Sequence, residues 1–130
     1  MRVQRAMPGL PHLLPNLLAV RKWLRTQHYE VVTLTDQATI AWDLDIAPVA
    51  LVTLGGNRLL TVSNIRNGAV YILFVLQDGT GSRTLSYSSD FLFAGGNLPV
   101  LSTGAGAEDI LTFIPRASKL RGGQFGAGFA

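Results

Sequence analysis

The side chains that most often perform chemistry in proteins are few and scattered in this sequence. It contains no cysteine and only two histidines, His12 and His28, both near its start. A serine-histidine-aspartate triad needs its histidine beside the nucleophile, and the Gly-x-Ser-x-Gly elbow is missing. So few nitrogen and sulfur ligands also argue against a transition-metal site. We therefore expect a protein that is not an enzyme and that needs no cofactor and no metal.

The acidic residues permit other chemistry, but their spacing favours plain turns and strand ends. Asp43 and Asp45 alternate at the end of a predicted strand, whereas a glycosidase needs two carboxylates that flank a sugar cleft. Asp78 and the pair Glu108-Asp109 offer oxygen ligands in loops, but neither matches the spacing of a calcium-binding EF-hand loop. We interpret the first pair as a solvated strand end and the others as turns.

The segment from Asp78 to Arg83 predicts a turn with a structural role. Asp78-Gly79 is a dipeptide that supplies the positive φ angles of hairpin turns, and Gly81 follows it closely. Arg83 lies near enough in sequence to pair with Asp78 and to hold the turn in place. If partly buried, such a pair stabilises by about 1 kcal/mol. We assign the four residues to this structural turn.

Charge is distributed unevenly along the chain. Residues 1–28 carry five basic and no acidic residues, and residues 29–114 carry three basic against eight acidic ones. Residues 115–130 add three basic residues, which brings the net charge to +3. Basic ends around an acidic middle are typical of arms that bind an oppositely charged partner. The predicted organisation is a basic arm and helix (1–28), a β-sandwich domain (29–115) and a basic, glycine-rich tail (116–130).

The arm and the tail are the predicted assembly elements. After an extended start, Asn16 can cap an amphipathic helix that runs to about Gln27. A helix of about three turns is too short to be stable alone, so it must dock on its own domain, a second copy or a larger partner. In the tail, two aromatic residues stand among glycines. The candidate assembly residues are Arg2, Arg5, Leu17, Val20, Arg21, Trp23, Leu24, Arg25, Phe125 and Phe129.

Between the arm and the tail, short β-rich runs separated by turn residues predict a mostly β fold. The run from Ala69 to Leu76 has the length of a buried strand, and Gly55-Gly56-Asn57 is typical of a tight hairpin turn. We expect an antiparallel, jelly-roll-like β-sandwich with a short amino-terminal helix and extended termini. The predicted strands are Val31–Thr35, Thr39–Leu44, Val49–Leu54, Arg58–Val62, Val70–Gln77, Ser82–Ser86, Asp90–Phe93, Val100–Ser102 and Ile110–Ile114.

Composition limits the partners. No apolar run reaches the ~20 residues that a membrane-spanning helix needs. The basic ends could contact phosphate, but no DNA- or RNA-reading motif is present, so nucleic acid is not expected as the main partner. The sequence is 48% hydrophobic and only 15% charged, which indicates that neighbouring subunits bury part of its surface.

Six segments of the chain, taken in order, resemble a known type of β-domain. They are Ala38–Leu44, Val52–Arg58, Gln77–Leu85, Phe91–Gly96, Pro99–Thr103 and Asp109–Phe113. Their order resembles a β-domain found in phage tail-fibre, receptor-binding and other virion proteins, often as the last module of a longer chain. Two features depart from that pattern: a basic helical arm precedes the module here, and a basic, glycine-rich tail follows Phe113. The resemblance implies a virion component without supplying any binding residue.

Three functions follow as hypotheses. The first is a non-enzymatic structural protein of a tailed-phage virion, a homo-oligomer and preferably a trimer, in a tail fibre, spike or fibre base. It would bind itself and other virion proteins, and would lie in the host cytoplasm during assembly. The second is a head decoration or cement protein. The third is a carbohydrate-binding module for host attachment, in which Trp42, Tyr71 or Tyr87 would offer an exposed platform to a surface glycan.

Overall fold

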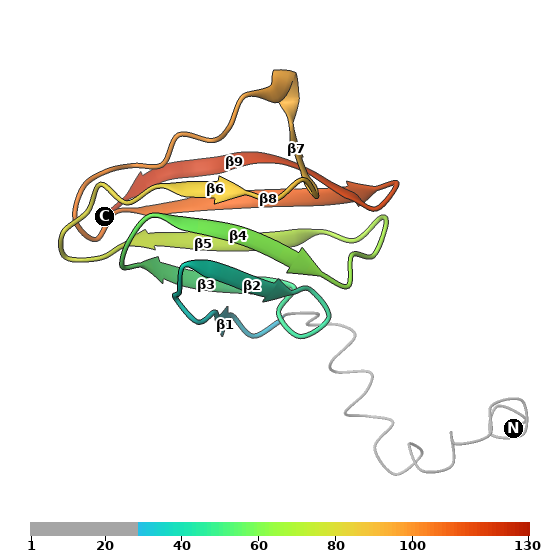
Figure 1. The fold of residues 1–130 in the computed structure, drawn as a ribbon, viewed down its shortest axis with the longest axis horizontal. Helices are drawn as coiled ribbons and strands as arrows, with labels where there is room; N and C mark the ends of the chain where they lie inside the picture. The colour runs from blue at the N-terminus through green and yellow to red at the C-terminus, as the bar shows by residue number, and fades with distance from the viewer. Residues whose placement is uncertain (1–28) are drawn as a thin grey trace, which may run out of the picture.

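The computed structural model describes residues 29–130, which form two β-sheets packed face to face around one core (Figure 1). The larger sheet has six strands in the order β1-β3-β5-β8-β9-β7, and the smaller has three in the order β2-β4-β6. The elements are β1 (Val32–Thr33), β2 (Thr39–Asp43), β3 (Val49–Leu54), β4 (Arg58–Ser63), β5 (Tyr71–Gln77), β6 (Leu85–Tyr87), β7 (Phe91–Phe93), the short 3-10 helix η3 (Ala94–Gly96), β8 (Glu108–Arg116) and β9 (Lys119–Phe129).

The first seven strands alternate between the two sheets, so the chain winds as a coil. Strands β1, β3 and β5 pair in parallel in the larger sheet, and β2, β4 and β6 pair in parallel in the smaller one. Across both sheets, five of the seven pairings are parallel. The prediction of a mostly β fold is confirmed, but the antiparallel, jelly-roll-like arrangement is not. Strand spacing and alternation are the same in both arrangements and do not distinguish them.

The two segments predicted as hairpin turns connect strands of different sheets. Gly55-Gly56-Asn57 lies between β3 and β4, and the loop that starts at Asp78 leads from β5 to β6. In this second loop, Gly81 (φ 75°) and Ser82 (φ 58°) take the positive φ angles, instead of Asp78 and Gly79. A Cβ atom on Gly81 would lie 2.5 Å from the Thr103 carbonyl oxygen, so close packing also requires glycine there.

Within residues 29–130, a hairpin joins β8 to β9. The carboxyl terminus therefore differs from its prediction. Residues 116–130, predicted as a tail outside the sandwich, complete β8 and form the whole of β9. Strand β9 pairs antiparallel with β8 and parallel with β7, so the hairpin lies between β5 and β7 in the larger sheet. Its turn residues, Ala117 (φ 51°) and Ser118 (φ 58°), adopt positive φ angles without a glycine. The predicted helix and arm lie outside the described residues.

One predicted strand, Val100–Ser102, belongs instead to the long connection between η3 and β8. Side chains from the sheets hold this connection. The Gln77 amide donates a hydrogen bond to the Ser102 carbonyl oxygen at 3.0 Å. The buried Asp109 carboxylate accepts hydrogen bonds from the Ser102 backbone and hydroxyl at 2.6 and 2.8 Å. These buried polar groups fix a segment that has no ladder of its own.

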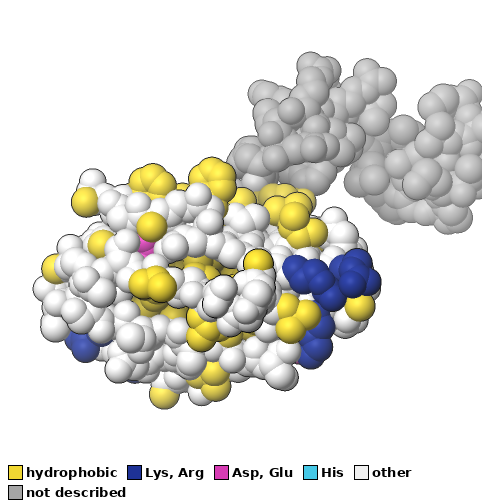
Figure 2. Space-filling view, turned by 90° about the horizontal axis from the view of Figure 1, so that it is seen from above, with side chains coloured by type: hydrophobic (Ala, Val, Ile, Leu, Met, Phe, Trp, Pro, Cys, Tyr) yellow, Lys and Arg dark blue, Asp and Glu magenta, His cyan; other side chains and the backbone are white. Residues whose placement is uncertain are grey.

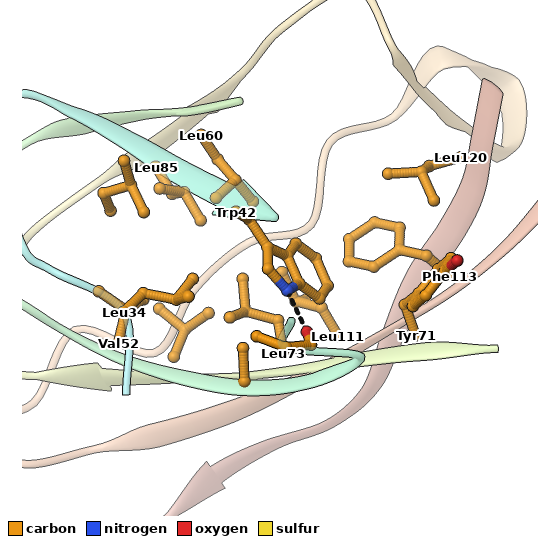
Figure 3. Close-up of a cluster of buried hydrophobic side chains, with 14 of the residues drawn as sticks. Leu34, Trp42, Val52, Leu60, Tyr71, Leu73, Leu85, Leu111, Phe113 and Leu120 are labelled. Carbon is orange, nitrogen blue, oxygen red and sulfur yellow. Dashed lines mark hydrogen bonds between the residues drawn. The ribbon is translucent and has the colours of Figure 1, made fainter. Parts of the chain in front are cut away.

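The core lies between the two sheets and is centred on aromatic side chains (Figure 3). Trp42 from β2 is fully buried and meets Tyr71 and Phe113 edge-on, with ring centroids 6.4 and 5.9 Å apart. Its indole N–H donates a hydrogen bond to the Ala47 carbonyl oxygen, which satisfies the polar atom that burial would otherwise leave unpaired. The two sheets are therefore held together by an apolar core in which the one indole N–H is paired.

Candidate assembly surface

Strand β5 is apolar on both of its faces. Tyr71, Leu73 and Val75 point into the core and are buried, whereas Ile72 and Phe74 alternate with them and are partly exposed on the opposite side. A strand with one face in water normally carries polar residues on that face. The outer side of the six-stranded sheet is therefore unusually apolar at strand β5.

The neighbouring strands extend this apolar side. In the ladder, Leu51 on β3 pairs with Phe74 on β5, which pairs with Ile110 on β8. Paired residues point to the same side of a sheet, so the three side chains form a row across it. We call this side the outer sheet face. Apart from its glycines and the charged residues at its ends, it comprises Val49, Leu51, Thr53, Ile72, Phe74, Leu76, Ile110, Thr112, Ile114, Phe125 and Phe129.

A shallow hollow of about 340 Å³ lies in the outer sheet face. It is lined by Ile72, Phe74, Ile110, Thr112 and Phe125. The Phe125 side chain is 74% exposed, although it is the largest apolar group that β9 contributes to the hollow. The hollow contains no charged side chain, so it suits an apolar occupant.

Glycines of β9 leave the outer sheet face open beside this hollow. Gly123 pairs with Thr112, and a Cβ atom on it would meet nothing within 4 Å. Gly126 pairs with Ile110, and its missing side chain makes room for the Phe129 ring, whose atoms lie 2.7 and 2.8 Å from the position of a Cβ atom. The candidate assembly residues Phe125 and Phe129 thus share one surface.

Charges mark the two ends of the outer sheet face. Glu108 begins β8 at one end, and Arg116 ends β8 at the other. Arg121 pairs with Ile114 and therefore also lies at the second end. Figure 2 shows Lys and Arg side chains gathered at the end of the molecule where the β8–β9 turn lies in Figure 1. The face is thus apolar along its length, with opposite charges at its ends.

The structural-turn residues lie in a loop and do not line the hollow. The Arg83 guanidinium contacts Asp78 through both carboxylate oxygens, at 3.3 and 3.0 Å. The same carboxylate accepts hydrogen bonds from the backbone N–H groups of Thr80 and Gly81 at 3.0 Å each. The guanidinium and these N–H groups lower the pKa of Asp78 to about 2. Gly79 lies in the turn, and a Cβ atom on it would meet nothing within 4 Å.

Asp43 and Asp45 have separate partners and do not form a carboxylate pair. Asp43 accepts hydrogen bonds from the Asn64 side-chain amide at 2.8 Å and from the Asp45 backbone at 3.0 Å. The Asp45 carboxylate instead receives two hydrogen bonds from the Arg66 guanidinium, at 3.0 and 2.9 Å. In residues 29–130, no group of three or more His, Cys, Asp or Glu residues is arranged to hold a metal ion.

Of the aromatic residues proposed for a glycan platform, two are buried and the third, Tyr87, is partly buried against the core. Trp42 and Tyr71 are buried in the core. The Tyr87 hydroxyl is also buried, has no hydrogen-bond partner among residues 29–130, and has its pKa raised by burial. A sugar-binding site needs an exposed aromatic face. The carbohydrate-binding hypothesis therefore loses the residues on which it depended.

Sequence reasoning found two residues of the outer sheet face and missed its centre. Phe125 and Phe129 were selected as aromatic anchors, whereas Ile72, Phe74 and Ile110 were counted only as strand residues. The signal was the unbroken apolar run of β5, because a strand with one wet face alternates in polarity. The arm residues chosen for assembly, from Arg2 to Arg25, lie outside the described residues.

Comparisons with known proteins add no relative to this description. Within residues 29–130, no helix is long and apolar enough to cross a membrane. The chain matches no protein-family model, no curated protein and no solved structure.

Proposed function

We propose that the chain is a non-enzymatic structural subunit that associates with copies of itself through the outer sheet face. The observation that carries the proposal is the apolar character of that face on strands β3, β5 and β8. An exposed apolar patch of this extent is typical of a protein interface. The hollow beside Phe125 offers a place for an apolar side chain of a second subunit.

We further propose that the assembly is part of a tailed-phage virion, in a tail fibre, spike or fibre base. The support is the resemblance in segments such as Gln77–Leu85 and Pro99–Thr103. In the fold, these two segments lie together, because Gln77 and Asp109 bind the Ser102 backbone. These hydrogen bonds fix the two segments to each other, which suits a rigid module that is stacked or displayed on a particle.

Self-association is tested by measuring the mass of the full chain by light scattering over a range of concentrations. We expect a concentration-dependent oligomer, weakened about tenfold or more by Phe125→Gln, because burying one aromatic side chain contributes ~2 kcal/mol or more. Phe125 is 74% exposed, so its replacement should leave the monomer folded, as circular dichroism will show. A wild-type chain that stays monomeric at high concentration contradicts the proposal.

The matched control is Val100→Gln. Val100 is 80% exposed and apolar, but it lies in the connection before β8 and not on the outer sheet face. We expect this variant to associate as the wild type does. An equal loss in both variants would mean that general surface hydrophobicity, and not this face, drives association.

The place in a virion is tested by labelling intact particles with an antibody against the chain and locating the label by electron microscopy. We expect label on a fibre, spike or fibre base. Label on the head surface would replace this proposal with the decoration or cement role. Particles that lack the protein would overturn both virion roles.

A further inference from the structure

The outer sheet face has an electrostatic polarity along its strands. Glu108 lies at the end where β8 begins, and Arg116 and Arg121 lie at the opposite end. The two rows between these ends contain no charge. They are Val49-Ile72-Thr112-Gly123 and Leu51-Phe74-Ile110-Gly126. A partner that fits this face must therefore be apolar in the middle and oppositely charged at each end.

The charges at these ends form no ion pair within the described fold, although the Arg121 guanidinium donates hydrogen bonds to the Arg116 and Lys119 carbonyl oxygens of the β8–β9 turn. Four other basic residues pair with an aspartate: Arg58 with Asp36, Arg66 with Asp45, Arg83 with Asp78 and Lys119 with Asp90. Within residues 29–130, Arg116, Arg121 and Glu108 take part in no ion pair. Within the described residues, no carboxylate pairs with Arg116 or Arg121 and no cation pairs with Glu108, so these three charges can pair with charges of a partner.

We infer that two copies pack their outer sheet faces together in antiparallel orientation, about a two-fold axis that crosses the strands. This inference rests on the proposed self-association and specifies its geometry. The axis exchanges the two ends of the face, so Glu108 of each copy comes opposite the Arg116 and Arg121 end of the other. The two uncharged rows also exchange, so Phe74 of each copy faces Ile72 of the other and Ile110 faces Thr112.

Other symmetries fit the charges less well. A three-fold axis along the strands, as expected for a trimer, would gather the glutamates of all copies at one level and the arginines at another. Like charges that face one another across an interface are destabilising, whereas a two-fold contact pairs each charge with its opposite. The charge pattern therefore favours a dimer through this face over the trimer expected from sequence.

The size of the face is close to what such a contact needs. Strands lie about 4.8 Å apart and residues about 3.3 Å apart, so four strands of about seven residues cover roughly 450 Å² on each copy. Two copies would bury roughly 900 Å² of this flat footprint, which is close to the ~1,000 Å² that a specific interface needs. Aligned sheets pack about 10 Å apart, a distance that apolar side chains of this size fill.

Charge exchange in the full chain tests the orientation. We expect Glu108→Arg, and separately Arg116→Glu with Arg121→Glu, to weaken dimerisation about tenfold, since each substitution acts twice in a two-fold contact. The triple variant should recover the wild-type dissociation constant to within about threefold, because the exchanged charges again face their opposites. Analytical ultracentrifugation at low and high salt measures these constants, and salt should weaken the wild-type dimer.

Thr39→Arg is the control, since Thr39 is exposed on β2 of the smaller sheet. We expect it to leave dimerisation unchanged. Two results overturn the antiparallel arrangement while self-association stands: a triple variant that does not recover, or a trimer insensitive to these charges. A wild-type chain that is monomeric at all concentrations overturns the arrangement together with the proposed function.

Discussion

The two faces of the six-stranded sheet are similar in polarity and differ in what covers them. The inner face is buried under β2, β4 and β6 and contributes Leu73, Leu111 and Phe113 to the core. The outer face is also apolar, but within residues 29–130 no second layer covers it. In a sheet made to face water, the second face would be polar. This difference supports the proposal that the outer face packs against a second copy.

The glycines of β9 show the same contrast within one strand. Gly122 points inward, and a Cβ atom there would lie 2.1 Å from the Phe113 ring. Gly123 follows it directly and points outward, where a Cβ atom would meet nothing within 4 Å. The inner glycine is required by packing inside the molecule, and the outer one only leaves space outside it.

The largest expected difference between the faces is in stability. Phe113→Ala should lower the free energy of unfolding by about 3–5 kcal/mol, because it opens a cavity beside Trp42 and Phe91. Phe125→Ala on the outer sheet face should change it by less than about 0.5 kcal/mol in the monomer. Urea denaturation at low protein concentration measures both. Similar losses from the two variants would show that the faces are not distinct.

A smaller effect is expected from the two neighbouring glycines. Gly122→Ala should destabilise by about 1–3 kcal/mol, since the new methyl group forces the Phe113 ring out of its position. Gly123→Ala should be neutral or stabilising by up to about 1 kcal/mol, because alanine reduces the freedom of the unfolded chain. Thermal unfolding of the two variants beside the wild type tests this. A stable Gly122→Ala protein would contradict the packing described for the inner face.

The smallest effect concerns the Asp78 turn, which belongs to neither face. The pKa of Asp78 is lowered to about 2 in the folded state, below its ordinary value of 3.8. The charged carboxylate therefore stabilises the fold above about pH 4, and this contribution is lost as the pH falls toward 2. The wild type should be more stable than Asp78→Asn at neutral pH, and the difference should shrink on acidification.

The oligomeric state of the Asp78→Asn variant provides the control for this prediction. Asp78→Asn should leave the oligomer unchanged at neutral pH, because the turn does not line the hollow of the outer sheet face. Denaturation series at several pH values, with the mass measured at neutral pH, test both statements. A stability difference that stays constant from neutral to acidic pH would mean that the ion pair with Arg83 is not its source.

Much of the fold was predictable from local patterns, because alternation and turn residues act over a few positions. Strand β3 was predicted with the bounds that it has, Val49–Leu54, and most other strands within a few residues. The carboxyl-terminal strand was missed, since glycines are unfavourable in isolated strands. Strand β9 forms through its pairing with β8 and β7 and through the contact between Gly122 and the Phe113 ring, all of which involve other parts of the fold.

The outer sheet face was likewise only partly predictable from the sequence. Phe125 and Phe129 were identified from sequence, because aromatic residues among glycines have no local reason to be there. Their position beside Ile72 and Phe74 depends on pairings between strands far apart in the chain. The residues next to a position in sequence do not indicate such long-range pairings. This part of the surface could therefore be identified only from the folded structure.

By itself, the sequence determined that the chain is mostly β, where most of its strands lie, and that it contains no cysteine and only two histidines. These properties follow from side-chain chemistry and short-range periodicity. The tertiary structure decided that the strands pair mainly in parallel and that the glycine-rich end joins the sheet. It also decided which apolar residues gather on the outer sheet face. The physical reason is that ladder pairing and packing link residues that are distant in sequence, and alternation is the same for every such pairing.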